Sequence, residues 1–172
     1  MDNLGLKELT PDNYLQIDEI MGAFVAAKGE GGVKPVSPCE WASEILAVRL
    51  TADVPLEVRR LFAVARGTML YGYYFYPLYA LATEQLLRVA EAGLSERCHE
   101  LGAPAAVNNF SRRIVWLRSQ RILSDEEAGL WHALRGLRNS ASHPADQLIL
   151  PPGSALGVLK RIAEHVSGLY RK

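Results

Sequence analysis

The residues best suited to chemistry lie close together near the C-terminal end of the chain. Arg138, Asn139 and His143 form an Arg-Asn-x3-His run that Pro144 follows directly. Arginine carries a permanent planar charge that matches a phosphate group, and histidine titrates near neutral pH. The pair suits metal-free RNA cleavage, in which arginine neutralises charge on phosphorus and histidine moves a proton to or from the 2′-hydroxyl or the leaving 5′-oxygen.

Pro144 gives the arginine and the histidine a physical reason to meet. In an unbroken helix, Arg138 and His143 would point about 140° apart. The residue before a proline is pushed out of the helical region, so we predict that the helix ends near residues 140–142 and that His143 turns back toward Arg138. The alternative is that both side chains simply cap the helix end and complement its dipole.

Three further polar residues are candidates for binding a substrate. Arg135 and Ser142 fall on the same helical stripe as Arg138. Glu84, within an apolar helical stretch, is either a buried partner for one of these arginines or part of a solvated stripe with Arg88 and Glu91. The sequence leaves these two alternatives for Glu84 open.

The spacing of apolar residues predicts a chain built from helices, and no stretch predicts a strand. Capping residues and prolines mark several helix starts, including a Ser37 capping box and a Ser124 capping box. The expected helices cover residues 11–27, 38–49, 56–100 with a kink or break near 73–77, 106–120, 124 to about 141, and 154–170. We therefore predict an all-α antiparallel bundle over residues 55–172, with an N-terminal helical extension over residues 1–54 packed on it.

Two clusters in the predicted helices have both a functional and a structural interpretation. Five of the seven tyrosines lie between residues 71 and 79, where they form either a base-stacking platform or, as we favour, a core or subunit interface. Four arginines between residues 112 and 121 form either a phosphate-facing surface or a solvated face whose stems cover the core. These four are Arg112, Arg113, Arg118 and Arg121.

Composition sets limits on the class of protein. The 172 residues are 49% hydrophobic and carry no net charge, which argues against nonspecific coating of nucleic acid. The charge is uneven, because residues 111–172 contain 10 Lys and Arg against 5 Asp and Glu. Cys39 and Cys98 are too few for a disulfide scaffold, and no metal or other cofactor is expected. Without a signal peptide or a membrane-length apolar run, we expect a cytoplasmic location and no membrane contact.

The region from about residue 61 to 162 resembles the HEPN superfamily. The resemblance rests on Arg138, Asn139 and His143, which match the short form of the family's R-x(4-6)-H motif, and on the apolar helical run before them. It implies an all-α metal-independent ribonuclease, often a toxin or defence protein, that works as a homodimer with both motifs in one cleft. In that case Arg138 and His143 are catalytic, Asn139 is supportive, RNA is the substrate, and an antitoxin or other protein is a partner.

Other function classes fit the same sequence. Some members of that superfamily serve as catalytically silent modules, so the alternative is a helical module that dimerises or binds protein or nucleotide, with the tyrosine-rich helix as its interface. A third class is a nucleotide-binding or nucleotidylation partner.

Overall fold

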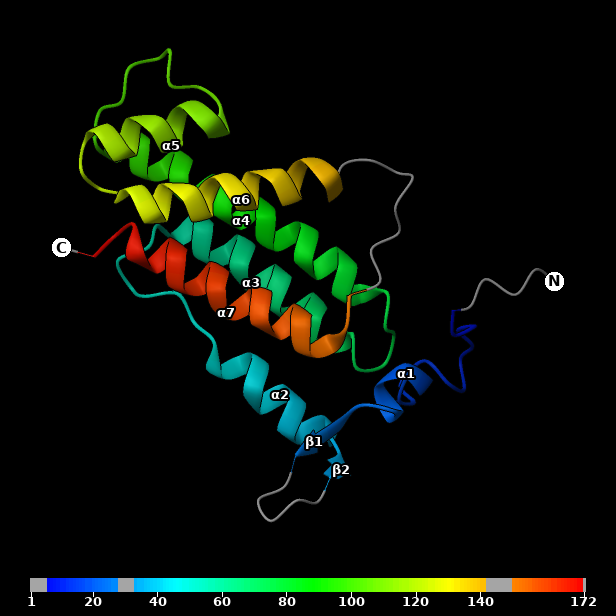
Figure 1. The fold of residues 1–172 in the computed structure, drawn as a ribbon. Helices are drawn as coiled ribbons and strands as arrows, with labels where there is room; N and C mark the ends of the chain where they lie inside the picture. Colours follow the sequence, from blue (N-terminus) through cyan, green and yellow to red (C-terminus); the bar gives the residue numbers. More distant parts are fainter. Residues whose placement is uncertain (1–5, 28–32, 142–149, 172) are drawn as a thin grey trace.

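A computed structural model of the protein describes residues 6–27, 33–141 and 150–171. Within these ranges the chain is mainly helical, and its single sheet is a two-stranded antiparallel hairpin (Figure 1). The all-α prediction is therefore confirmed in its main feature. In chain order the elements are α1 (Glu19–Gly22), β1 (Val25–Ala27), β2 (Val33–Pro35), α2 (Pro38–Ala47), α3 (Leu56–Tyr71), α4 (Leu78–Glu100), α5 (Phe110–Ser119), α6 (Asp125–Ala141) and α7 (Pro152–Gly168).

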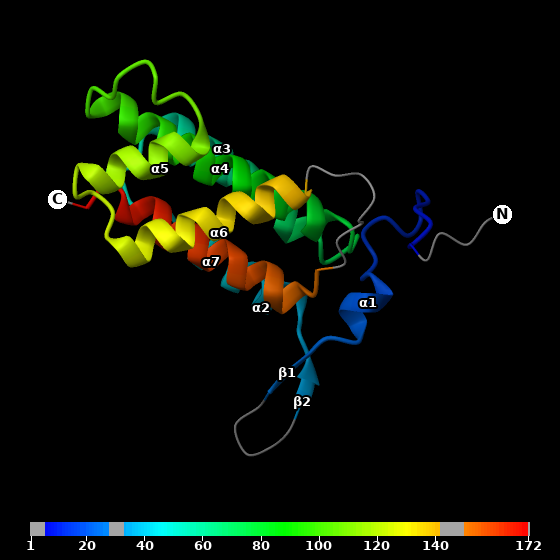
Figure 2. The same cartoon turned by 45° about the horizontal axis from the view of Figure 1, so that its top comes forward.

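Helix α4 is the centre of the bundle. It packs against α3, α5, α6 and α7, and the turned view in Figure 2 shows α6 and α7 running alongside it. The hairpin of α5 and α6 is a layer of its own, since these two helices also pack on each other. The buried residues of α4 lie on one broad face, and the opposite face carries exposed residues that include Leu81, Glu84 and Arg88.

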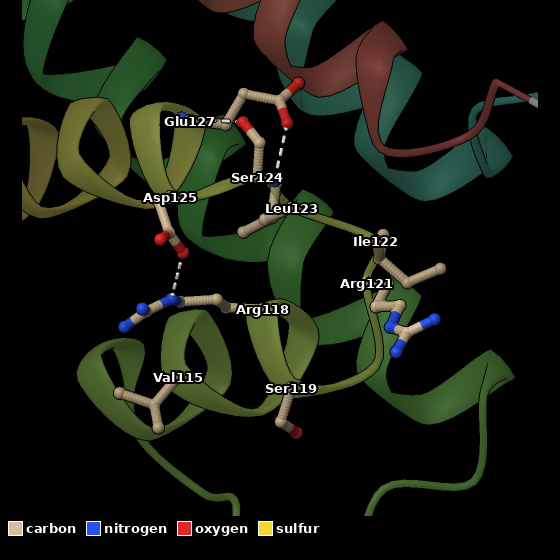
Figure 3. Close-up of a pocket in the computed structure, with 9 residues that line it drawn as sticks. All are labelled: Val115, Arg118, Ser119, Arg121, Ile122, Leu123, Ser124, Asp125 and Glu127. Atoms are coloured by element: carbon tan, nitrogen blue, oxygen red, sulfur yellow. Dashed lines mark hydrogen bonds and ion pairs between the residues drawn. The ribbon is translucent and has the colours of Figure 1, made fainter.

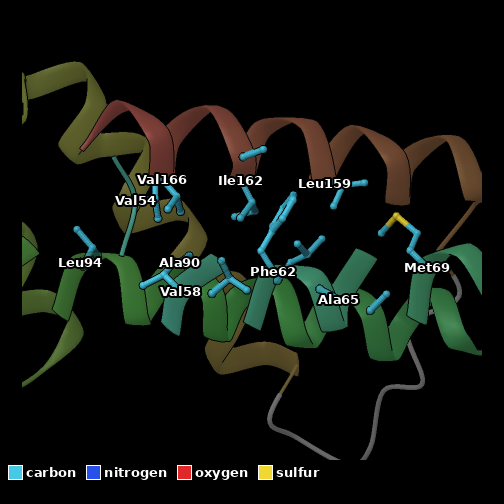
Figure 4. Packing of buried hydrophobic residues seen from close by; sticks show 14 of the residues in the cluster. Val54, Val58, Phe62, Ala65, Met69, Ala90, Leu94, Leu159, Ile162 and Val166 are labelled. Atoms are coloured by element: carbon cyan, nitrogen blue, oxygen red, sulfur yellow. The ribbon is translucent and has the colours of Figure 1, made fainter. Parts of the chain in front are cut away.

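The core lies between α3, α4 and α7. Figure 4 shows Leu159, Ile162 and Val166 of α7 pointing down toward α3 and α4, where they meet Phe62 and Ala90. Each of these side chains is at least 95% buried, and burial of a large apolar side chain stabilises a fold by roughly 1.5–3 kcal/mol. This packing fixes the position of α4. It therefore determines where the side chains on the outer face of α4 point.

Local signals in the sequence explain where the helices begin. Ser37 accepts a hydrogen bond from the backbone N–H of Glu40, whose carboxylate accepts one from the backbone N–H of Ser37. Ser124 and Glu127 form the same reciprocal pair at the start of α6. Both predicted capping boxes are confirmed. The fifth helix starts later than predicted, because the side chain of Asn109 caps it by accepting from the backbone N–H of Arg112.

The prediction of a helix over residues 11–27 is wrong. Residues 11–16 form turns, the short α1 follows, and β1 then pairs with β2 in the register Val25 with Pro35. The break occurs at Asp18, whose extended backbone makes it the N-cap of α1. Its carboxylate accepts from the backbone N–H groups of Ile20 and Tyr76, so the N-terminal extension is tied to the turn between α3 and α4. The extension packs on the bundle, but it is less helical than predicted.

The predicted interruption of the helix over residues 56–100 is confirmed as a complete break between α3 and α4. Gly72 caps α3 there, and the ring of Tyr79 lies so close that a Cβ at position 72 would come within 2.8 Å of it. The backbone of Gly72 is right-handed helical, which any residue adopts. The constraint on this glycine is therefore the space that the buried Tyr79 ring occupies.

Replacing Gly72 with alanine is expected to destabilise the protein by about 1–3 kcal/mol, because the added methyl group overpacks a fully buried ring. Gly67→Ala is the matched control, since nothing lies within 4 Å of a Cβ at that position within α3. It is expected to stabilise the protein by up to about 1 kcal/mol. Chemical denaturation of both variants measures the difference, and equal stabilities would contradict the packing argument.

Candidate functional site

The candidate site lies at the C-terminal end of α6. The helix ends at Ala141, within the predicted range, and Arg138 stands in its last turn with 46% of its side chain exposed. Asn139 also lies in this last turn, where the backbone alone is described. Ser142 and His143 lie outside the described residues, so the predicted approach of His143 to Arg138 stays a prediction.

Glu91 on α4 connects Arg138 to the rest of the bundle. One carboxylate oxygen, Oε2, lies 3.4 Å from Arg138 Nη2, and the other, Oε1, lies 3.9 Å from Nη1 of Arg113 on α5. A single acidic side chain from the central helix thus contacts one arginine from each of the two helices packed over it. Its spacing in the sequence placed Glu91 only on a solvated stripe with Glu84 and Arg88, so its position between two arginines was missed.

The sequence left two alternatives open for Glu84, a buried partner of an arginine or a member of a solvated stripe. Glu84 lies two turns before Glu91 on the same face of α4, and its side chain is exposed. Of the two alternatives, the solvated stripe is the one that the structure supports. The same face of α4 nevertheless carries Glu91, which contacts Arg138.

Arg135 lies one turn before Arg138 on the inner side of α6. The side chain is half-buried, and its Nε atom is buried without a hydrogen-bond partner among the described residues. A buried donor left without an acceptor costs about 1–3 kcal/mol. Because this atom has no exposed surface, a bound phosphate could reach it only if the side chain of Arg135 rearranged.

The four arginines of residues 112–121 do not form one phosphate-facing surface. Arg112 donates to the backbone carbonyl of Ala106 at 3.0 Å, and Arg118 pairs with Asp125 at 2.5 Å between Nε and Oδ1. Arg113 faces Glu91, as described above. One of the four therefore reaches the candidate site.

A concave region lies where α5 turns into α6. It has a volume of about 690 Å³, and Figure 3 shows Arg118 reaching across it to Asp125 while Ser124 and Glu127 close the start of α6. The bonds that Ser124 donates hold the pKa of Glu127 below its ordinary value, so this carboxylate is charged at neutral pH. Acidic and basic groups thus neutralise each other here, and the groove lacks the excess positive charge that a phosphate site needs.

The tyrosine cluster is part of the core and not a stacking platform. Tyr73, Tyr76 and Tyr79 are each at least 92% buried, and the hydroxyl of Tyr73 donates to the backbone carbonyl of Val36 at 2.9 Å. Burial raises the pKa of Tyr79 well above its ordinary value. Tyr71, at the end of α3, is the exposed member of the cluster. The favoured interpretation as core is supported, and most of these rings cannot reach a nucleic acid base.

Among the side chains of the described ranges, no three His, Cys, Asp or Glu residues gather closely enough to hold a metal ion. None of the described helices is both long and apolar enough to cross a bilayer.

Comparison of the chain with protein-family models, with curated proteins and with solved structures finds no match. The case for a function therefore depends on the residues and contacts described above.

The turn after α5 contains a strained residue that can be tested. Arg121 has φ of 59°, in the left-handed region, and its backbone N–H bonds to Arg118 while that of Ile122 bonds to Leu117. These two bonds form a Schellman motif, in which glycine is the usual residue at this position.

Arg121→Gly is expected to raise the free energy of unfolding by about 1 kcal/mol, since glycine adopts a positive φ without steric cost. The midpoint of thermal unfolding should rise by about 2–4 °C for a chain of this length. Arg112→Gly, within α5, is the control and should lower the midpoint. A lower midpoint for Arg121→Gly would show that the side chain contributes more than the strain costs.

Proposed function

We propose that the protein is a HEPN-like, metal-independent RNA endonuclease that acts as a homodimer. The observation that carries the proposal is the position of Arg138, half-exposed in the last turn of α6 and paired with a carboxylate of the central helix. The described bounds of α6, which reach Ala141, support it, because they agree with the expectation that Pro144 disfavours a helix at the residue before it. A role as a toxin or defence protein with an antitoxin or other protein partner is part of the same proposal.

In the proposed reaction the 2′-hydroxyl of RNA attacks the neighbouring phosphorus, and the bond from phosphorus to the 5′-oxygen breaks. His143 moves the proton to or from these oxygens, and Arg138 stabilises the charge that builds up on the phosphorus oxygens. Asn139 supports the arrangement, while Arg135, Ser142 and Glu84 are the proposed substrate-binding residues. The products are a 2′,3′-cyclic phosphate and a 5′-hydroxyl, which balance the reaction without water or metal.

Arg138→Ala and His143→Ala are each expected to reduce RNA cleavage in EDTA by a factor of at least about 10². Arg161→Ala, which removes an exposed arginine from α7, is the control for lost charge. Cleavage is followed by gel electrophoresis of a labelled RNA, and circular dichroism checks that each variant folds. Cleavage that persists in both variants would refute the proposal.

A second candidate function, a catalytically silent module that dimerises, is favoured by one surface. Leu130, Ala133 and Leu137 form an exposed stripe on α6 at spacings of three and four residues, and the two leucines are 44% and 57% exposed. The stripe lies on the same helix as Arg138. Burial of this stripe against a second copy would stabilise a dimer in either candidate function, with or without cleavage.

Leu137→Glu is expected to convert the homodimer to a monomer, because it places a charge within the stripe. Val64→Glu is the matched control, since Val64 is 59% exposed on α3, away from α6. Analytical ultracentrifugation at micromolar concentration measures the state of each variant. A wild-type protein that is monomeric under these conditions would contradict dimerisation in both candidate functions.

A further inference from the structure

We propose that Arg113 is a second phosphate-contacting arginine of the candidate site, held beside Arg138 through their shared carboxylate, Glu91. The inference rests on the RNA substrate of the proposed function, and it names a binding residue that the motif at the end of α6 does not contain. Arg113 comes from a different helix, so the proposed site is built from α4, α5 and α6 together.

The contact between Arg113 and Glu91 is the first observation that supports this role. At 3.9 Å between Nη1 and Oε1, it is the longest of the ion pairs in the described part of the chain and lies beyond hydrogen-bond distance. The guanidinium of Arg113 makes no hydrogen bond to any described residue, although its side chain is only 18% exposed. A guanidinium has five N–H donors. An acceptor-rich ligand such as a phosphodiester would satisfy donors that Glu91 leaves unsatisfied.

The loose pairing of Arg113 differs from the pairing of the other two arginines of α5. The guanidinium of Arg112 donates to a backbone carbonyl at 3.0 Å, and that of Arg118 lies 2.5 Å from Asp125. Both are more exposed than Arg113, yet both have closer partners. Arg113 is therefore the arginine of α5 that is both close to Arg138 and loosely paired.

Glu91 explains how two arginines can be held side by side before RNA binds. Its single negative charge contacts both guanidinium groups, one on each oxygen, and so offsets their mutual repulsion. All three side chains keep some exposure to solvent, at 18%, 46% and 32% for Arg113, Arg138 and Glu91. A phosphate that approaches this face meets both guanidiniums at once. Glu91 is in this view a positioning residue and Arg113 a binding residue.

The test measures binding of a short unstructured RNA oligonucleotide by fluorescence anisotropy in EDTA, at a series of salt concentrations. All proteins carry His143→Ala so that the RNA stays intact. Arg113→Met removes the charge and keeps an apolar stem over the core, which protects the fold. Arg112→Met is the matched control, because it removes the same charge from the neighbouring position on α5. Thermal unfolding checks that both variants fold.

Arg113→Met is expected to weaken RNA binding about tenfold and to reduce the slope of log affinity against log salt by about one. Arg112→Met should change affinity by no more than about twofold, since an exposed arginine tied to a backbone carbonyl contributes little. If the two variants bind RNA equally well, Arg113 has no special role and the inference is overturned.

Cleavage by the proteins that retain His143 separates this inference from the proposed function. If the wild-type protein does not cleave but Arg113→Met alone loses affinity, the binding site stands and the nuclease proposal fails. If the wild-type protein cleaves and Arg113→Met behaves like Arg112→Met, the nuclease stands and the inference fails. If the wild-type protein neither binds nor cleaves RNA, both are overturned.

Discussion

The packing of α4 against four other helices is the constraint on which the rest of the structure depends. Helix α4 buries one broad face against α3, α5, α6 and α7, and exposed charged residues such as Glu84 and Arg88 occupy the opposite face. Charged groups are costly to bury unless they are paired, so a half-buried acidic residue at the edge of the packed face is expected to pair with a neighbouring helix. Glu91 stands at the seam between α5 and α6, where it meets an arginine from each.

The sequence predicted most of the helices because their signals are local. Capping boxes, prolines at helix starts and apolar spacing are all contained within a few residues, and α2, α3, α4, α6 and α7 begin within two residues of the predicted positions. Residues 11–27 were predicted wrongly because their apolar residues have helical spacing without a core to face. Tyr14, Leu15 and Ile17 are between 41% and 56% exposed. That helix is interrupted at Asp18, whose carboxylate accepts a hydrogen bond from the backbone N–H of Tyr76. Tyr76 is distant in sequence, so no local pattern predicts this bond.

The candidate site also contains residues that the sequence could predict and residues that it could not. The motif predicted Arg138 as a site residue, and Pro144 predicted where α6 ends. Both signals lie within one stretch of the chain. Glu91 and Arg113 could not be predicted, because their meeting depends on how α4, α5 and α6 are aligned along one another. Periodicity placed Glu84 and Glu91 on one stripe of this helix, two turns apart, and it did not indicate which of them an arginine meets. An offset of that size is set by packing between helices, and periodicity alone does not contain it.

Three hydrogen bonds attach the N-terminal segment to the turn between α3 and α4. Asp18 accepts from the backbone N–H of Tyr76, the backbone N–H of Asp18 donates to the carbonyl of Tyr73, and Lys7 donates to the carbonyl of Tyr74. On the bundle side, all three bonds end on main-chain atoms. These three bonds therefore follow the backbone path of the turn, whereas the hydroxyls of Tyr73 and Tyr79 add side-chain bonds to Val36 and Met21 of the segment. On the segment's side the side chains of Asp18 and Lys7 make the bonds to the turn, so a substitution at either position removes part of the attachment.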